Sequence, residues 1–220
     1  MKKKTIALAL VLVMVFGATL GGTFAYLTSQ DTVTNTFTVG NVKITMDEAK
    51  VNLYGEPVDN NGKTESEVTT GWTAAGRVKA NEYKLLPGHT YTKDPTIYVD
   101  AKSEDAWLFV KVENGISAIE ATGNTTIANQ MAANWTLVPG TTNIYAYKEK
   151  VSANSNVKVF DSFTVSGDAK NNAPENAADR IPGVQYIEDY ATVQIVVTAY
   201  AIQADGFTTA AAAWTAAGLN

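Results

Sequence analysis

The sequence predicts a mainly β protein: an antiparallel, jelly-roll-like β-sandwich with short helices, including one at the C-terminus. Apolar and polar residues alternate with a period of two along much of the 220-residue chain, as in half-buried strands. Polar turns rich in Gly, Pro and Asn separate these stretches. A composition that is 45% hydrophobic and 10% aromatic supplies the apolar surface for a core. Many short strands with polar turns are typical of sandwich and jelly-roll folds.

Residues 1–25 have the pattern of a secretory signal peptide. Three lysines at 2–4 precede an apolar stretch at 6–20, and small residues before Tyr26 predict cleavage between Ala25 and Tyr26. The alternative is a retained membrane anchor, but the apolar stretch is shorter than the roughly 20 residues that a bilayer core requires. We therefore expect an exported protein with no stable membrane insertion after cleavage.

Residues 26–40 are predicted to form an N-terminal arm that contains one strand. Even positions from 32 to 38 are all Thr, whereas the odd positions form the second face. After Gly40 the apolar residues move to even positions, and a shift of one residue turns a strand over. Gly40 therefore marks either a bulge within one sheet or a hinge between two strands. The odd-numbered face of the arm consists of Val33, Asn35, Phe37 and Val39.

The main domain is expected to span residues 41–220. Leu108, Val110 and Val112 should share one face of a strand, with Trp107 and Phe109 on the other. The run Ile195-Val196-Val197 is apolar on both faces, which predicts a central strand covered on both sides. Strands are expected at 42–46, 83–86, 96–99, 107–112, 135–138, 143–147, 157–165 and 191–203; helices at 126–133 and 208–217; and loops at 58–76 and 168–182.

Composition excludes several classes of function. The chain has no Cys and a single His, which rules out disulfides, thiolate chemistry and metal sites built on several His. The net charge is −5, and loss of the three lysines at 2–4 makes it −8, which argues against nucleic-acid and anionic-lipid partners.

No motif predicts catalysis. His89 lies in a predicted turn, and the sequence has no second His for a zinc protease motif. Adjacent residues on a strand point to opposite faces, so neighbouring carboxylates are not expected to act together as an acid and a base. Residues 59–67 carry oxygen ligands but fail the EF-hand spacing, so we expect a polar hairpin tip there. We expect no enzyme activity, no metal site and no cofactor. The carboxylate pairs that we expect to be solvated charges are Asp47-Glu48, Glu104-Asp105 and Glu188-Asp189.

Several segments give the chain a resemblance to the TasA/camelysin family. The start of the predicted mature chain, Ala-Tyr-Leu-Thr at 25–28 followed by Asn-Thr-Phe-Thr-Val-Gly-Asn-Val at 35–42, is the most specific of them. Leu-Pro-Gly at 86–88 and the strand-like run at 106–112 are similar to the next block of the family. The run at 197–203, with an Ala- and Trp-containing helix after it, resembles uncharacterised members from gut bacteria.

The resemblance implies a secreted subunit of extracellular biofilm matrix fibres, at the surface of a bacterium. It implies processing by a SipW-type signal peptidase and head-to-tail self-assembly, with other matrix or anchor proteins as further partners. The arm at 26–39 of one subunit would fill a gap in a sheet of the next, with Gly40 as its pivot. Val33, Phe37 and Val39 would be its pocket-filling side chains.

Three alternatives remain at this stage. In the first, the arm pairs within its own subunit as an ordinary edge strand. In the second, the protein is a monomeric cell-surface module, for example one that binds polysaccharide. In the third, it is a metalloprotease like those described among camelysins, which the single His disfavours. Exposed aromatic residues at loop tips would favour the surface module, with Trp72, Trp107, Tyr145 and Tyr147 as its candidates.

Overall fold

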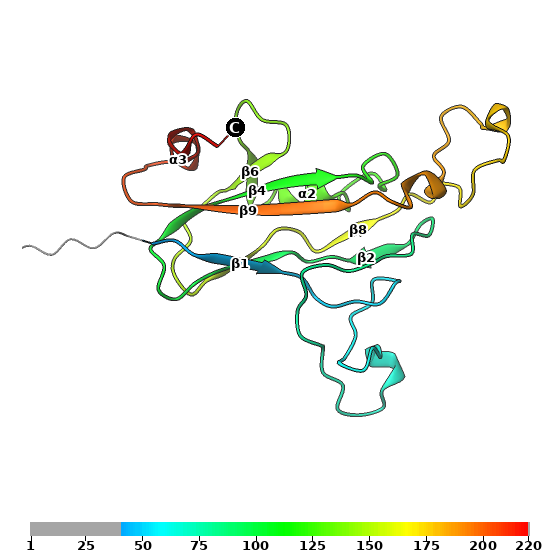
Figure 1. Cartoon of the computed structure of the whole chain (residues 1–220), viewed down its shortest axis with the longest axis horizontal. Coiled ribbons are helices and arrows are strands. Elements are labelled where there is room, and N and C mark those ends of the chain that lie inside the picture. Colours follow the sequence, from blue (N-terminus) through cyan, green and yellow to red (C-terminus); the bar gives the residue numbers. More distant parts are fainter. Residues whose placement is uncertain (1–40, 220) are drawn as a thin grey trace, which may run out of the picture. The chain divides into compact units, whose positions relative to one another are not determined.

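The computed structural model describes residues 41–219 of the chain (Figure 1). Over these residues the protein is mainly β, with antiparallel sheets and a C-terminal helix, as the sequence predicts. The predicted features that lie outside the described residues are the signal peptide, the cleavage site at Ala25 and Tyr26, the arm with Val33, Asn35, Phe37 and Val39, and the hinge at Gly40.

A four-stranded antiparallel sheet forms one layer. Its order is β5-β6-β4-β9, so the two long strands pair with each other and β9 lies at one end. The pairing of β4 with β9 is continuous from Ala106 opposite Gln203 to Asn114 opposite Ile195. The strands are β4 (Ala106–Asn114), β5 (Trp135–Leu137), β6 (Ile144–Tyr147) and β9 (Ile195–Gln203).

Two smaller antiparallel sheets form the second layer, in the orders β1-β3-β7 and β2-β8. Strand β2 continues into β3, and β7 continues into β8. The backbone nitrogen of Lys93 donates to the oxygen of Asp161 at 3.1 Å, and that of Val159 to Pro95 at 2.8 Å, so backbone bonds join the two sheets at the bend. The strands are β1 (Ile44–Asp47), β2 (Thr90–Thr92), β3 (Thr96–Val99), β7 (Asn156–Lys158) and β8 (Ser162–Thr164).

The main core lies between the two layers. Leu108, Val110 and Val112 of β4 face it, together with Ile97 from β3 and Phe163 from β8. All five side chains are buried, and burial of this apolar surface is the main favourable term in folding. The structure thus confirms the predicted inner face of β4.

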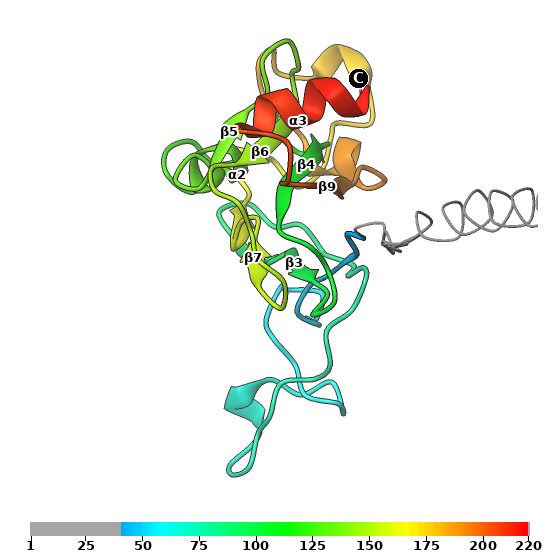
Figure 2. The ribbon, with the colours of Figure 1, turned by 90° about the vertical axis from the view of Figure 1, so that its left-hand side faces the viewer.

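Helix α3 (Ala210–Ala217) covers the outer face of the four-stranded sheet (Figure 2). Trp214 packs on Phe109 at 4.9 Å and on Tyr200 at 5.6 Å between ring centroids, and Trp107 belongs to the same cluster. Thr209 caps the helix by accepting a hydrogen bond from the backbone nitrogen of Ala212 at 3.2 Å. Helix α3 therefore covers the part of this face that carries Trp107, Phe109 and Tyr200.

Helix α2 (Ile127–Met131) packs into the main core near β5 and β8. Its residues Ile127 and Met131 are buried. The side chain of Gln130 accepts hydrogen bonds from the backbone nitrogens of Asp161 and Ser162 and donates to the oxygen of Ser162 at 2.8 Å. A side chain thus pairs the backbone of β8 at a place where no further strand from residues 41–219 continues the sheet. The remaining helices are the 3-10 helices η2 (Glu65–Glu67), η3 (Ala177–Asp179) and η4 (Ile187–Tyr190).

Three expected strands differ from the structure. Residues 83–86 form no strand; they run irregularly, and the backbone nitrogen of Leu86 donates to the Tyr91 hydroxyl at 2.7 Å. The predicted strand at 157–165 is two strands, because the chain bends between β7 and β8. The expectation that 191–203 is a central strand is not met among residues 41–219: β9 starts at Ile195, and within this part of the chain it pairs with β4 alone. Local sequence carries the strand periodicity but not the order of strands in a sheet.

Candidate functional site

Strand β9 has a backbone edge that no strand among residues 41–219 covers. Two backbone hydrogen bonds at its ends fix the direction of its backbone groups: the Gly115 nitrogen donates to the Gln194 oxygen at 3.0 Å, and the Ala204 nitrogen donates to the Asp105 oxygen at 2.7 Å. Hydrogen-bonded and non-bonded pairs alternate along an antiparallel ladder. Thr198, like the other even residues of β9, therefore bonds to β4.

The odd residues of β9 consequently direct their backbone nitrogens and oxygens away from β4. No strand among residues 41–219 pairs with β9 on that side. Unpaired backbone groups along an edge are a template for an additional strand. The residues concerned are Ile195, Val197, Ala199, Ala201 and Gln203.

The side chains along this edge are apolar and incompletely covered. Ile195, Val197, Ala199 and Ala201 lean on the main core and are half-buried, while Val196 on the opposite face is 39% exposed. The side chains of Ala199 and Ala201 are single methyl groups, which leave room for a larger side chain beside them. The edge therefore offers both hydrogen-bonding groups and apolar surface.

Strand β1 is the edge of the second layer on the same side. Its Cα atoms come within 8 Å of those of β9, and Figure 1 shows β1 (blue) beside β9 (orange). The backbone nitrogen of Asp100 donates to the Lys43 oxygen at 2.9 Å, so by alternation the backbone groups of Ile44 point away from β3. Ile44 and Met46 are also half-buried against the main core. Two edges, one from each layer, thus face the same gap.

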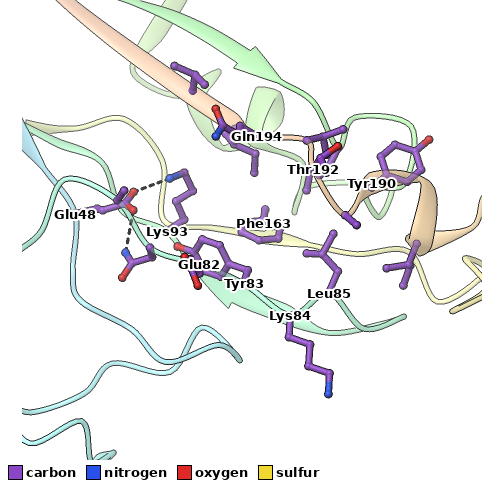
Figure 3. A pocket seen from close by; sticks show the side chains of 18 of the residues that line it. Glu48, Glu82, Tyr83, Lys84, Leu85, Lys93, Phe163, Tyr190, Thr192 and Gln194 are labelled. Atoms are coloured by element: carbon purple, nitrogen blue, oxygen red, sulfur yellow. Dashed lines mark hydrogen bonds and ion pairs between the residues drawn. The ribbon is translucent and has the colours of Figure 1, made fainter.

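A groove of about 1260 Å³ opens where this gap begins, between the end of β1 and the start of β9. Its wall includes residues 79–86, Phe163 and residues 190–197 (Figure 3). Burial raises the pKa of the Tyr83 phenol above its ordinary value, and the nearby Glu48 carboxylate adds to the effect. Tyr83 is therefore a neutral, largely apolar part of the wall at physiological pH.

Charged groups beside the groove are paired. Glu48 is only 4% exposed, and its Oε2 lies 2.6 Å from the Lys93 Nζ. Arg77 binds Asp47 at 2.5 Å and Asp94 at 2.9 Å. Burial lowers the pKa of Arg77, but the hydrogen bonds that Arg77 donates to Asp94 and Asp47 outweigh this effect and raise the pKa overall. The prediction that Asp47 and Glu48 are solvated charges is therefore wrong.

Asp47 and Glu48 pair with different cations, Arg77 and Lys93. Of the other predicted pairs, Glu104 and Asp105 are exposed, and Asp189 forms an ion pair with Arg180 at 2.7 Å.

The candidate residues for other functions are scattered. His89 lies after a turn, and its Nε2 is 2.8 Å from the Tyr54 oxygen. Trp107 is buried under α3, and the half-buried Trp72 donates from its indole to the Lys63 oxygen at 3.0 Å. Tyr145 and Tyr147 lean on the main core.

Within residues 41–219 no three His, Asp or Glu side chains are grouped so that they could hold a metal ion. Over the same residues, none of the helices has the length and apolar character needed to cross a bilayer.

The sequence predicts an arm but does not indicate a surface that could receive it. The sequence feature that marks this surface in β9 is the apolar run Ile195–Val197, followed by small residues at 199 and 201.

Comparisons with protein-family models, with curated proteins and with solved structures found no match.

Proposed function

We propose that this protein is a secreted structural subunit that polymerises head to tail, with the arm of one copy added as a strand to the open edge of β9 in the next. Strand addition uses main-chain hydrogen bonds for affinity and alternate side chains for specificity. A head-to-tail contact of this kind, which does not close on itself, produces a filament. The observation that carries the proposal is the unpaired, apolar edge of β9.

The arm and the edge match in chemistry. The segment 32–39 contains no charged residue, so it can enter the gap without burying an unpaired charge. The odd-numbered residues of the arm lie on one face, with the same two-residue spacing as the inward-facing residues of β9. Phe37 would lie over the small Ala199 or Ala201, and the threonines would face outward.

We further propose that the two layers form a jelly-roll-like sandwich, and that the protein acts as a scaffold rather than as an enzyme. A resemblance to TasA/camelysin proteins, on the residues quoted above, supports export, processing by a SipW-type signal peptidase and a place in the matrix or at the surface of a bacterium. Polymer formation with itself is the primary interaction in this proposal, and other matrix or anchor proteins are secondary partners.

Electron microscopy of two purified chains tests the proposal. A chain that starts at Tyr26 is expected to form filaments, and a chain that starts at Gly40 is expected to remain monomeric. Equal filament formation by the two chains would contradict a role for the arm.

A matched pair of substitutions in the arm tests the predicted face. Phe37→Lys places a charge on the inward face and should abolish filaments, whereas Thr38→Lys on the outward face should retain them. If both variants polymerise like the parent chain, the arm does not insert in this register.

A further inference from the structure

Three polar side chains from separate segments meet in the wall of the groove. Glu48 follows β1, Lys93 follows β2, and Asn81 lies in the irregular segment between them in sequence. The Glu48 Oε2 binds the Lys93 Nζ at 2.6 Å, and the Glu48 Oε1 accepts a hydrogen bond from the Asn81 Nδ2 at 2.9 Å. One carboxylate thus holds an amine and a carboxamide on its two oxygens; Figure 3 shows the contact between Glu48 and Lys93.

Hydrogen bonds fix the orientation of the Asn81 amide. Its Nδ2 also donates to the Ala49 oxygen at 2.9 Å, while its Oδ1 accepts from the Val51 backbone nitrogen at 3.0 Å. A backbone N–H on the carbonyl oxygen polarises the Cγ=Oδ1 bond and stabilises negative charge that develops on the oxygen. The Asn81 carboxamide is therefore held in one orientation, with its carbonyl oxygen on a backbone donor.

The surroundings exclude most water. The side chains of Lys93 and Glu48 are 11% and 6% exposed. Next to them, the Tyr83 ring packs edge-on against Phe163 at 5.1 Å and Tyr91 at 5.7 Å. The ion pair therefore lies against aromatic rings and largely out of contact with bulk water.

We propose that Lys93 and Asn81 join in an intramolecular isopeptide bond, with Glu48 as the catalytic acid and base. A proton passes from Nζ to Oε2, and the neutral amine attacks Cγ of Asn81. The Nζ–Cγ bond forms and the Cγ–Nδ2 bond breaks. Glu48 gives its proton to the departing nitrogen, which leaves as ammonia, and takes up the proton that the new amide nitrogen releases. No oxidant, reductant or cofactor is required.

The bond would close residues 81–93 into a covalent ring. This ring carries the segment with Tyr83 that lines the groove, so it would hold that wall in place. The inference concerns the described chain alone and does not depend on polymerisation.

Mass spectrometry of the full chain tests the inference. The purified protein should be lighter than its sequence by one molecule of ammonia. Trypsin should leave Lys93 uncut and yield a branched peptide in which residues 80–84 are joined to residues 85–102. Detection of the unmodified mass, with separate peptides and cleavage after Lys93, would overturn the inference.

Substitutions test whether the loss of ammonia originates at these residues. Lys93→Arg retains the positive charge, and Glu48→Gln retains the shape of the carboxylate; each should restore the full mass. Glu113→Gln is the matched control because Glu113 pairs with Lys111 at 3.0 Å on the surface, and this variant should keep the bond. A loss of ammonia that persists in Lys93→Arg would also overturn the inference, because it would originate at another asparagine.

Discussion

Proline substitutions at two neighbouring positions of β9 test the direction of its backbone groups. The nitrogen of Thr198 points to Lys111 in β4, whereas the nitrogen of Ala199 points to the open edge. Thr198→Pro removes a ladder hydrogen bond and leaves the Lys111 oxygen without its partner, which should lower the free energy of unfolding by about 2–4 kcal/mol. Ala199→Pro removes no bond to β4 and should cost less than about 1 kcal/mol.

Urea denaturation of the chain that starts at Gly40 measures these differences without interference from the arm. Equal destabilisation by the two prolines would refute the assigned alternation along β9.

The same pair tests the proposed function in the chain that starts at Tyr26. Ala199→Pro removes one donor for the incoming strand, worth about 1 kcal/mol, so it should weaken self-association at least about fivefold in sedimentation experiments. Normal polymerisation of this variant, with unchanged stability, would show that the arm does not pair with β9.

Three further predictions concern the described fold, each measured by urea denaturation. Trp214→Ala empties the smaller core under α3 and should cost about 3–5 kcal/mol; a cost under about 1 kcal/mol would contradict that packing. Burial raises the pKa of Glu120 above its ordinary value of 4.5, so its contribution to stability is complete below that value and is lost as the pH rises through the raised pKa. The parent chain should therefore lose stability relative to Glu120→Gln above that pH, and parallel pH profiles would contradict this. Gly55→Ala should cost about 3 kcal/mol or more, because Gly55 has φ +76° and a Cβ there would lie 2.6 Å from the Tyr91 Cα, whereas Gly62→Ala, with φ +80° but open space, should cost about 1–2 kcal/mol; equal costs would exclude the clash.

The elements that sequence predicted well are those with local signals. The alternation in β4 placed Leu108 and Trp107 on the correct faces, and the Pro139-Gly140 turn separated β5 from β6. Thr126 marked the start of α2, where it accepts a hydrogen bond from the backbone nitrogen of Asn129. A few neighbouring residues determine each of these features.

The candidate site could not be predicted in the same way. The apolar residues of β9 are compatible with a central strand or with an edge that awaits a partner, and only the pairing of distant segments distinguishes the two. Glu48, Asn81 and Lys93 share no motif or regular spacing, because the turns between β1 and β2 bring them together. The proposed roles of the arm and of Gly40 remain predictions.

The layers on the two faces of the four-stranded sheet have a consequence for any association that it makes. Helix α3 covers part of one face and the second layer covers the other, so an added strand would meet the sheet at its edge, where peptide groups supply the hydrogen bonds. Every residue type except proline carries both of those groups. Copies that differ only in outward-facing residues would keep these bonds and the inward side chains, so mixed fibres of related but unequal subunits are compatible with the proposed function.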